Sequence, residues 1–104
     1  MGTEKGVKLD AGKNRLDLIP VEAIEAIGNV LTFGAEKYTP DGWKTVPDAE
    51  NRYYAALLRH LFAYRRGEIT DPESGLPHLH HVICNAAFLI WLEDNELPKT
   101  EPSL

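Results

Sequence analysis

The sequence predicts an all-α fold: a small bundle of three to four helices that assembles into an oligomer and carries an extended N-terminal arm. Apolar residues recur with the period of a helix in three segments of the 104-residue chain, and strong strand alternation is missing outside a short stretch near residues 7–19. The third segment is apolar around nearly its whole circumference. Two companion helices cannot enclose such a helix, so we expect a second copy of the chain to cover it.

Three parts follow one another along the chain. Residues 1–14 contain several Gly and Lys residues without periodicity, which predicts a flexible arm. Residues 15–95 hold the helical domain. Residues 96–104 are polar and contain proline, which predicts a disordered tail.

The first helix is expected from Pro20 to about Tyr38, because proline is favoured at a helix start. One arc of this helix is apolar and the opposite arc is acidic, which is the pattern of a helix with one buried face. The apolar arc comprises Ala23, Ile24, Ile27, Leu31 and Ala35, and the acidic arc contains Glu22, Glu25 and Glu36. Such acidic stripes are usually solvated surface.

The second helix restarts near Pro47, after the turn YTPDGW, and ends at Gly67. Thr45 or Asp48 is the nearest candidate for its cap. His60 is expected at the edge of the buried face. The residues expected on that face are Tyr54, Leu57, Leu58, Leu61, Phe62 and Tyr64.

The third helix is expected from Pro77 to about Asp94, and its first turns carry three histidines. At 100° per residue, His78, His81 and Asn85 share one inward sector, whereas His80 points away. Buried polar groups need partners. Neighbouring backbone could supply them, and an H-x-x-H pair could equally hold a metal ion with the upstream carboxylates of Asp71 and Glu73.

Other candidate sites have ordinary alternatives. Glu68-x-x-Asp71 could bind a hard cation, although a solvated helix end is the favoured interpretation. Lys13 and Arg15 could bind phosphates without forming a P-loop, since the full motif is missing. The remaining candidates are the cation Lys37 and the aromatic residues Tyr38 and Trp43. The two rings could stack on a nucleotide base, or they could form a small aromatic cluster that closes the turn.

The composition excludes several function classes. A net charge of −5 argues against binding to a DNA or RNA duplex or to a membrane surface. No apolar stretch is long enough for a membrane span, and the polar N-terminus is unlike a signal peptide, so we expect a cytoplasmic protein. Cys84, the single cysteine, lies in an apolar run and is expected to be a buried, inert thiol.

Three runs carry a family resemblance: DAGKNRLDLIP, FGAEKYTPDGW and ALLRHLFAYRRGEITDPESGLPHLHHVICNAAFL. Together they resemble the dATP/dGTP diphosphohydrolase N-terminal-domain family of bacteriophages, which is related to the MazG-like all-α nucleotide pyrophosphohydrolases. The resemblance covers residues 8–92. It implies a phage protein acting in the host cytoplasm, and a homo-oligomer that cleaves purine deoxynucleoside triphosphates to monophosphate and pyrophosphate with Mg²⁺ or Mn²⁺.

The resemblance also implies roles for residues of this chain. The implied catalytic residues are Glu68, Asp71 and Glu73. The implied metal ligands are Glu68, Asp71, His78 and His81. The implied nucleotide-binding residues are Lys13, Arg15, Lys37, Tyr38, Trp43, Arg59, His60 and Asn85.

The chain departs from MazG-like enzymes in its donor residues, because histidine replaces much of their carboxylate set, and histidine is a poorer ligand for Mg²⁺. Two functions therefore stay open, beside a purely structural helix bundle that would bind no nucleotide. The first is a metal-dependent purine (deoxy)nucleoside triphosphate diphosphohydrolase. The second is a non-catalytic oligomeric sponge that sequesters nucleotides or nucleotide-derived immune signals and thereby opposes host defence.

Overall fold

The computed structural model describes residues 12–95, and this part of the chain is helical without any β-strand. It contains the short 3₁₀ turns η1 (Leu16–Leu18) and η2 (Gly42–Thr45) and the helices α2 (Val21–Lys37), α3 (Ala49–Arg65) and α4 (His78–Asn95). The all-α prediction is confirmed, and the three α-helices begin and end within about two residues of the expected positions. None of the helices in residues 12–95 has the length and apolar character that a membrane crossing requires.

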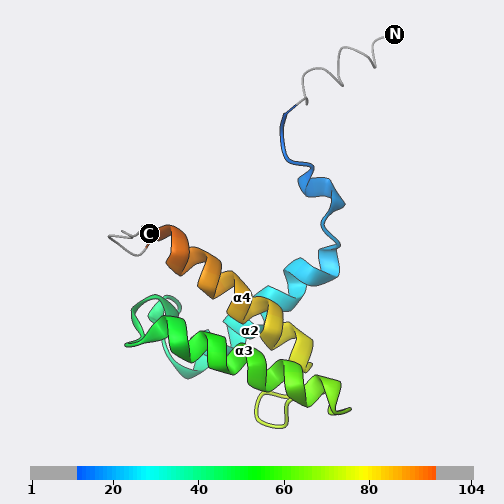
Figure 1. The fold of residues 1–104 in the computed structure, drawn as a ribbon, viewed down its shortest axis with the longest axis vertical. Coiled ribbons are helices and arrows are strands. Elements are labelled where there is room, and N and C mark those ends of the chain that lie inside the picture. The colour runs from blue at the N-terminus through cyan, green and yellow to red at the C-terminus, as the bar shows by residue number, and fades with distance from the viewer. Residues whose placement is uncertain (1–11, 96–104) are drawn as a thin grey trace, which may run out of the picture.

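The helices pack around α4, which contacts both α3 and α2 (Figure 1). The segment before α2 leads away from this packing (Figure 1). Most of the predicted arm and the whole predicted tail, residues 1–11 and 96–104, lie outside the described residues. The extended piece considered near residues 7–19 is replaced, in its described part, by the 3₁₀ turn η1.

The buried arc of α2 overlaps the predicted one but is shifted, since the predicted residues other than Ile24 are half-buried. Ala26 is buried, whereas Ile24 is exposed. The arc that faces α4 is therefore rotated toward Ala26, because a helix that packs against one neighbour buries only the side facing that neighbour. The acidic side chains Glu22 and Glu25 are exposed, as expected for a solvated stripe.

Helix α3 starts at the expected place without the expected capping bond. Asp48 occupies the cap position in a left-handed conformation (φ 56°), and its carboxylate does not bond to the helix amides. The Asp48 carboxylate instead accepts a hydrogen bond from Asn51 Nδ2 at 3.1 Å. At the other end, Gly67 has φ 106°, a conformation that glycine adopts without steric cost.

The buried face predicted for α3 is partly wrong. Tyr54, Phe62 and Tyr64 are exposed. Tyr53 and His60 instead face α4, where Tyr53 packs on Phe88 with ring centroids 4.8 Å apart. Leu57, Leu58 and Leu61 are half-buried, so one part of the predicted apolar face of α3 packs within one copy of the chain and the other part is exposed.

Helix α4 buries the stripe that the sequence predicted. His78, His81 and Asn85 are all less than a tenth exposed. Cys84 is fully buried, and burial raises the pKa of its thiol to about 11, so the thiol is inert as expected. His80 is not simply outward, because it is half-buried and its Nδ1 atom has no hydrogen-bond partner among the described residues.

Candidate functional site

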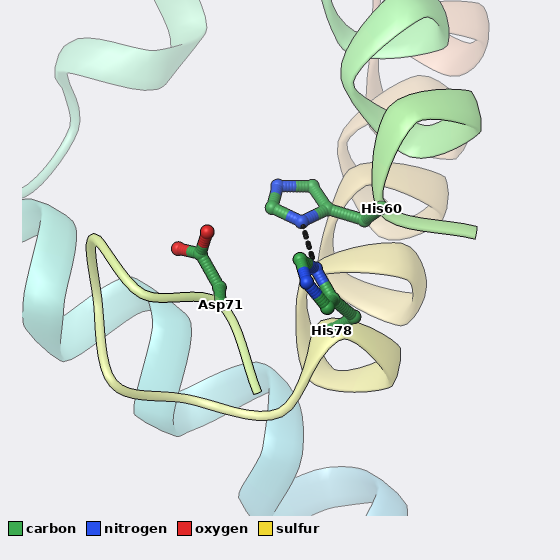
Figure 2. Close-up of side chains that lie close together, drawn as sticks. All are labelled: His60, Asp71 and His78. Atoms are coloured by element: carbon green, nitrogen blue, oxygen red, sulfur yellow. Dashed lines mark hydrogen bonds between the residues drawn. The ribbon is translucent and has the colours of Figure 1, made fainter. Parts of the chain in front are cut away.

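Three potential metal ligands meet where the first turn of α4 packs against α3. His78 begins α4, His60 comes from α3, and Asp71 comes from the connecting loop, residues 66–77 (Figure 2). One ligand atom from each of these residues lies within 4.8 Å of the other two. These residues form a candidate metal site, and we call His60, Asp71 and His78 the metal triad.

His78 is fixed through both ring nitrogens. Its Nε2 lies 2.8 Å from Glu68 Oε1, and its Nδ1 lies 2.8 Å from His60 Nδ1. An ionised carboxylate only accepts hydrogen bonds, so His78 Nε2 must carry the proton. The lone pair of His78 is therefore at Nδ1 and points toward His60. A carboxylate on the far nitrogen of a histidine is the usual support of a metal-binding imidazole.

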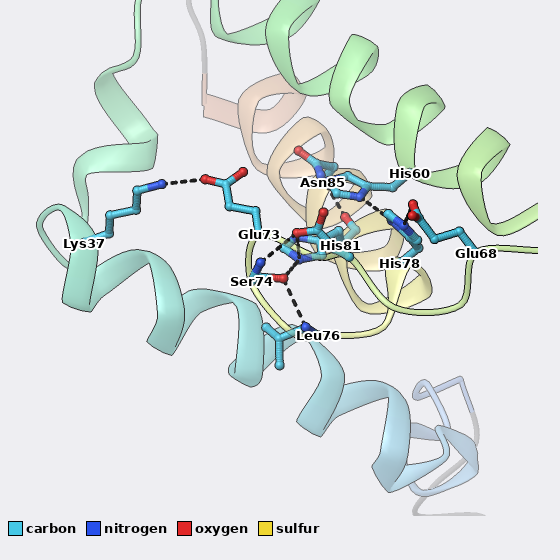
Figure 3. A network of polar contacts seen from close by, with 10 residues as sticks. Lys37, His60, Glu68, Glu73, Ser74, Leu76, His78, His81 and Asn85 are labelled. Carbon is cyan, nitrogen blue, oxygen red and sulfur yellow. Dashed lines mark hydrogen bonds and ion pairs between the residues drawn. The ribbon is translucent and has the colours of Figure 1, made fainter.

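A second layer of hydrogen bonds holds Asp71 and His81. The Ser74 amide donates to Asp71 Oδ2 at 3.0 Å, and the Leu76 amide donates to Ser74 Oγ at 3.1 Å. Ser74 Oγ also lies 2.7 Å from His81 Nε2 (Figure 3). His81 is 3.7 Å from Asp71 and stacks on His60 with ring centroids 4.3 Å apart. The turn carrying Asp71 is thereby fixed relative to both helices.

The electrostatics keep His60 and His81 neutral and Asp71 charged. Burial, followed by the neighbouring His81, lowers the pKa of His60 to about 4. Burial also lowers the pKa of His81, and Asp71 opposes that shift only in part. Burial alone would raise the pKa of Asp71, but the hydrogen bonds from Ser74 leave this pKa below its usual value. At neutral pH, His60 and Asp71 are therefore in the protonation states that bind metal ions.

The donor set decides which metals fit. Two imidazole nitrogens and one carboxylate suit transition metals such as Mn²⁺ or Zn²⁺, whereas Mg²⁺ prefers oxygen ligands and keeps several waters. Of the two ions that the family resemblance implies, this donor set fits Mn²⁺ better than Mg²⁺.

A cleft of about 850 Å³ adjoins His60 and runs between α2, the η2 turn and α3. This volume is within the range of small-molecule sites. Its lining includes cations, aromatic rings and amides, which can bind phosphates and a base. Six residues predicted from the sequence to bind nucleotide line this cleft: Lys37, Tyr38, Trp43, Arg59, His60 and Asn85.

The two aromatic side chains of the turn differ in their surroundings. Trp43 stacks on Phe88 (centroids 4.3 Å apart, planes 15° apart) and meets the ring of Trp91 edge-on. One face of Trp43 is thus covered, which favours the alternative of an aromatic cluster. Tyr38 is 70% exposed and lines the cleft, so its ring is accessible to a base even though the Lys37 ammonium lies 5.5 Å from the ring centre.

Two predicted phosphate-binding residues lie apart from this cleft. Lys13 and Arg15 are exposed and precede α2, on the segment that leads away from the helices. Arg15 binds Asp17 through two hydrogen bonds of 2.9 Å. The structure does not bring either cation to the cleft.

The structure brings two of the four predicted metal ligands into the triad and places the other two beside it. Asp71 and His78 belong to the metal triad, whereas Glu68 binds the outer nitrogen of His78 and His81 binds Ser74. His60, expected to contact nucleotide, joins the triad. Ser74 was missed, although D-x-x-S is a pattern in which the aspartate side chain accepts from a nearby amide.

Comparison with known proteins gives two matches. A family model described as "dATP/dGTP diphosphohydrolase, N-terminal" matches residues 3–101. A protein of Salmonella phage PMBT28 named dATP/dGTP diphosphohydrolase is 32% identical over 90 residues, which cover 86% of this chain and 30% of that relative. No solved structure matches the chain at a significant level. The family match includes every residue of the metal triad.

Proposed function

Because the chain belongs to the dATP/dGTP diphosphohydrolase N-terminal family, we propose that it binds purine deoxynucleoside triphosphates and hydrolyses them to monophosphate and pyrophosphate. The observation that carries this proposal is that His60 belongs both to the metal triad and to the lining of the cleft. A nucleotide in the cleft would therefore have its phosphates beside the candidate metal ligands.

His60, Asp71 and His78 would hold the metal ion in this proposal. A bound divalent ion would neutralise phosphate charge and orient a water molecule for attack. Glu68 fixes the tautomer of His78, and Ser74 fixes the orientation of Asp71. These contacts hold the donor atoms in place before a ligand arrives, which reduces the ordering that binding must impose.

The cleft residues would bind the nucleotide itself. The guanidinium group of Arg59 can bind two phosphate oxygens at once. The exposed ring of Tyr38 can stack on the purine, which requires no hydrogen-bond reading of the base. Both side chains line the same cleft as His60, so one ligand could contact all three.

The test of this function separates cleavage from binding. We propose incubation with dGTP or dATP in the presence of Mn²⁺, of Mg²⁺ or of EDTA, followed by chromatography of the nucleotides and a pyrophosphate assay. The proposal expects equal amounts of monophosphate and pyrophosphate with Mn²⁺, less product with Mg²⁺, and none with EDTA. Recovery of bound but intact nucleotide under all conditions would contradict hydrolysis.

One observation favours the binding-only alternative. The chain spans 30% of the length of the phage relative that it matches, so other parts of that relative could carry chemistry there. In that case this chain would retain nucleotides in the cleft without cutting them. Intact nucleotide recovered at one ligand per site, without a metal requirement, is the result that would support this function.

Glu68 provides a prediction about the metal triad. Replacing Glu68 with glutamine keeps the side-chain length but removes the negative charge beside His78 Nε2. We expect the affinity for Mn²⁺ to fall by about ten- to a hundred-fold, because loss of the carboxylate makes the imidazole a weaker donor. Isothermal titration calorimetry measures this change.

Glu93→Gln is the matched control, since Glu93 is an exposed acid on α4. This control should bind Mn²⁺ like the wild type. Equal Mn²⁺ affinity in the Glu68 and Glu93 variants would argue against a metal ion at His78.

We also propose that the chain assembles into a homodimer or a larger homo-oligomer. Tyr54, Phe62 and Ile90 are each more than half exposed, which is unusual for large apolar side chains on packed helices. Light scattering after size-exclusion chromatography should give a mass of at least two chains at micromolar concentration. A single-chain mass over the whole concentration range would exclude this assembly.

A further inference from the structure

An ion pair connects the last turn of α2 to the loop that carries Asp71. Lys37 Nζ lies 2.7 Å from Glu73 Oε2, although the two residues are 36 positions apart (Figure 3). Lys37 ends α2, and Glu73 is two residues after the Asp71 of the metal triad. The pair therefore joins the wall of the cleft to the metal triad's own loop.

Lys37 faces a ligand site, whereas Glu73 does not. Lys37 is part of the cleft lining and its ammonium group lies 5.5 Å from the centre of the Tyr38 ring. Glu73 is outside that lining, and its side chain is 70% exposed. The cleft thus presents a cation whose charge is neutralised by a carboxylate from the solvent side.

The loop around Glu73 keeps its shape without the ion pair. The Asp71 amide donates to the Leu76 carbonyl at 2.8 Å, and the Gly75 amide donates to the Asp71 carbonyl at 2.8 Å. Ser74 holds the Asp71 carboxylate from the same turn. Because these bonds fix the backbone, the Glu73 side chain can leave Lys37 by rotating its own bonds while Asp71 stays in place.

We propose that Glu73 is an internal competitor for the phosphates of the ligand, occupying Lys37 until an incoming polyphosphate displaces it. This inference rests on the proposed function in requiring a phosphate ligand in the cleft. In this proposal Glu73 lowers the affinity of the cleft for phosphate groups, whereas the family resemblance implies a catalytic role. Carboxylate and phosphate oxygens are alternative acceptors for one ammonium group, and an exposed ion pair is weak enough to exchange.

The test compares binding of inorganic tripolyphosphate in EDTA by calorimetry. Glu73→Gln should bind about two- to five-fold more tightly than the wild type, the range expected when a competing exposed ion pair is removed. Lys37→Met should bind more weakly. The double variant Lys37→Met/Glu73→Gln should bind tripolyphosphate no more tightly than Lys37→Met, because Glu73 then has no ammonium group to pair with.

Glu36→Gln is the control for net charge, since Glu36 is an exposed acid next to Lys37 that does not line the cleft. Its affinity should stay near that of the wild type at about 0.15 M salt, because the carboxylate that pairs with Lys37 is that of Glu73 and exposed charges without direct contact are weakened by screening. Binding by Glu73→Gln that is no tighter than binding by Glu36→Gln contradicts the inference alone. If the wild type does not bind tripolyphosphate in EDTA, the inference fails, whereas the proposed metal-dependent hydrolysis is decided separately by the incubation with dGTP and Mn²⁺.

Turnover gives a second readout of the same variants. If Glu73 only competes for Lys37, Glu73→Gln should lower KM for dGTP and leave kcat within about two- to three-fold of the wild type. A fall in kcat by about a hundred-fold or more would instead mark Glu73 as a general acid or base and overturn the inference.

Discussion

Replacing His78 with glutamine is expected to reduce pyrophosphate release from dGTP by about a thousand-fold in the presence of Mn²⁺, because a lost ligand removes several kcal/mol of charge stabilisation. Glutamine is the variant of choice because His78 is buried and alanine would leave a cavity. The glutamine amide can still donate to Glu68. Initial rates with saturating dGTP measure the loss of turnover, and titration with Mn²⁺ measures the loss of metal affinity in the same protein.

The matched control is the same substitution two residues later in α4. His80→Gln changes a histidine that is not part of the metal triad, and it should keep Mn²⁺ binding and turnover near wild-type values. Circular dichroism and thermal unfolding establish that both variants fold. If His78→Gln and His80→Gln retain the same turnover, the metal triad is not the catalytic centre.

We expect Trp43 to stabilise the fold and Tyr38 to bind the nucleotide. Trp43→Ala removes the stack on Phe88 and the edge contact with Trp91, so we expect a loss of about 2–3 kcal/mol in the free energy of unfolding. In a domain of this size that corresponds to roughly a 10 °C fall in Tm. Denaturant unfolding followed by circular dichroism measures the change.

Tyr38→Ala should weaken dGTP binding with little effect on the stability of the fold. Tyr38 is an exposed residue, so its removal should change stability by less than about 0.5 kcal/mol. The affinity for dGTP should nevertheless fall by about 1–3 kcal/mol, the value of one base stack. Tyr38→Phe keeps the ring and serves as the control. Unchanged dGTP affinity in Tyr38→Ala would place the base elsewhere in the cleft.

The helices were predictable because their limits are set by local chemistry. Pro20 and Pro77 immediately precede α2 and α4, and Gly67 follows α3 in a conformation with positive φ. Proline without an amide hydrogen and glycine without a side chain act on the backbone next to them, whatever the rest of the fold does. The inward stripe of α4 was predictable for the same reason, since the angle between His78 and His81 depends on helix geometry alone.

The faces of α3 were not predictable in the same way. The apolar content of Tyr54, Phe62 and Tyr64 suggested burial, yet the neighbour of α3 lies on the side of Tyr53 and His60. Which side of a helix meets its partner depends on how the connecting loop directs the next helix. A hydrophobicity pattern also cannot distinguish a surface buried within one chain from a surface that a second copy would cover.

The metal triad contains residues that sequence spacing could identify and one residue that only helix packing brings to the site. Spacing within the chain identifies His78 and Asp71 as candidates, because both belong to one continuous segment at the start of α4. The third member, His60, is 18 residues before His78 and reaches it only because α3 packs against α4, bringing the two Nδ1 atoms to 2.8 Å. The same packing turns Glu68 toward the outer nitrogen of His78, and the packing of α2 against α4 places Lys37 beside Glu73. Residue types and helix periodicity thus specified which side chains could belong to the candidate metal site. The packing of distant segments decided which of them meet, because the distance between two helices cannot be read from the sequence of either helix.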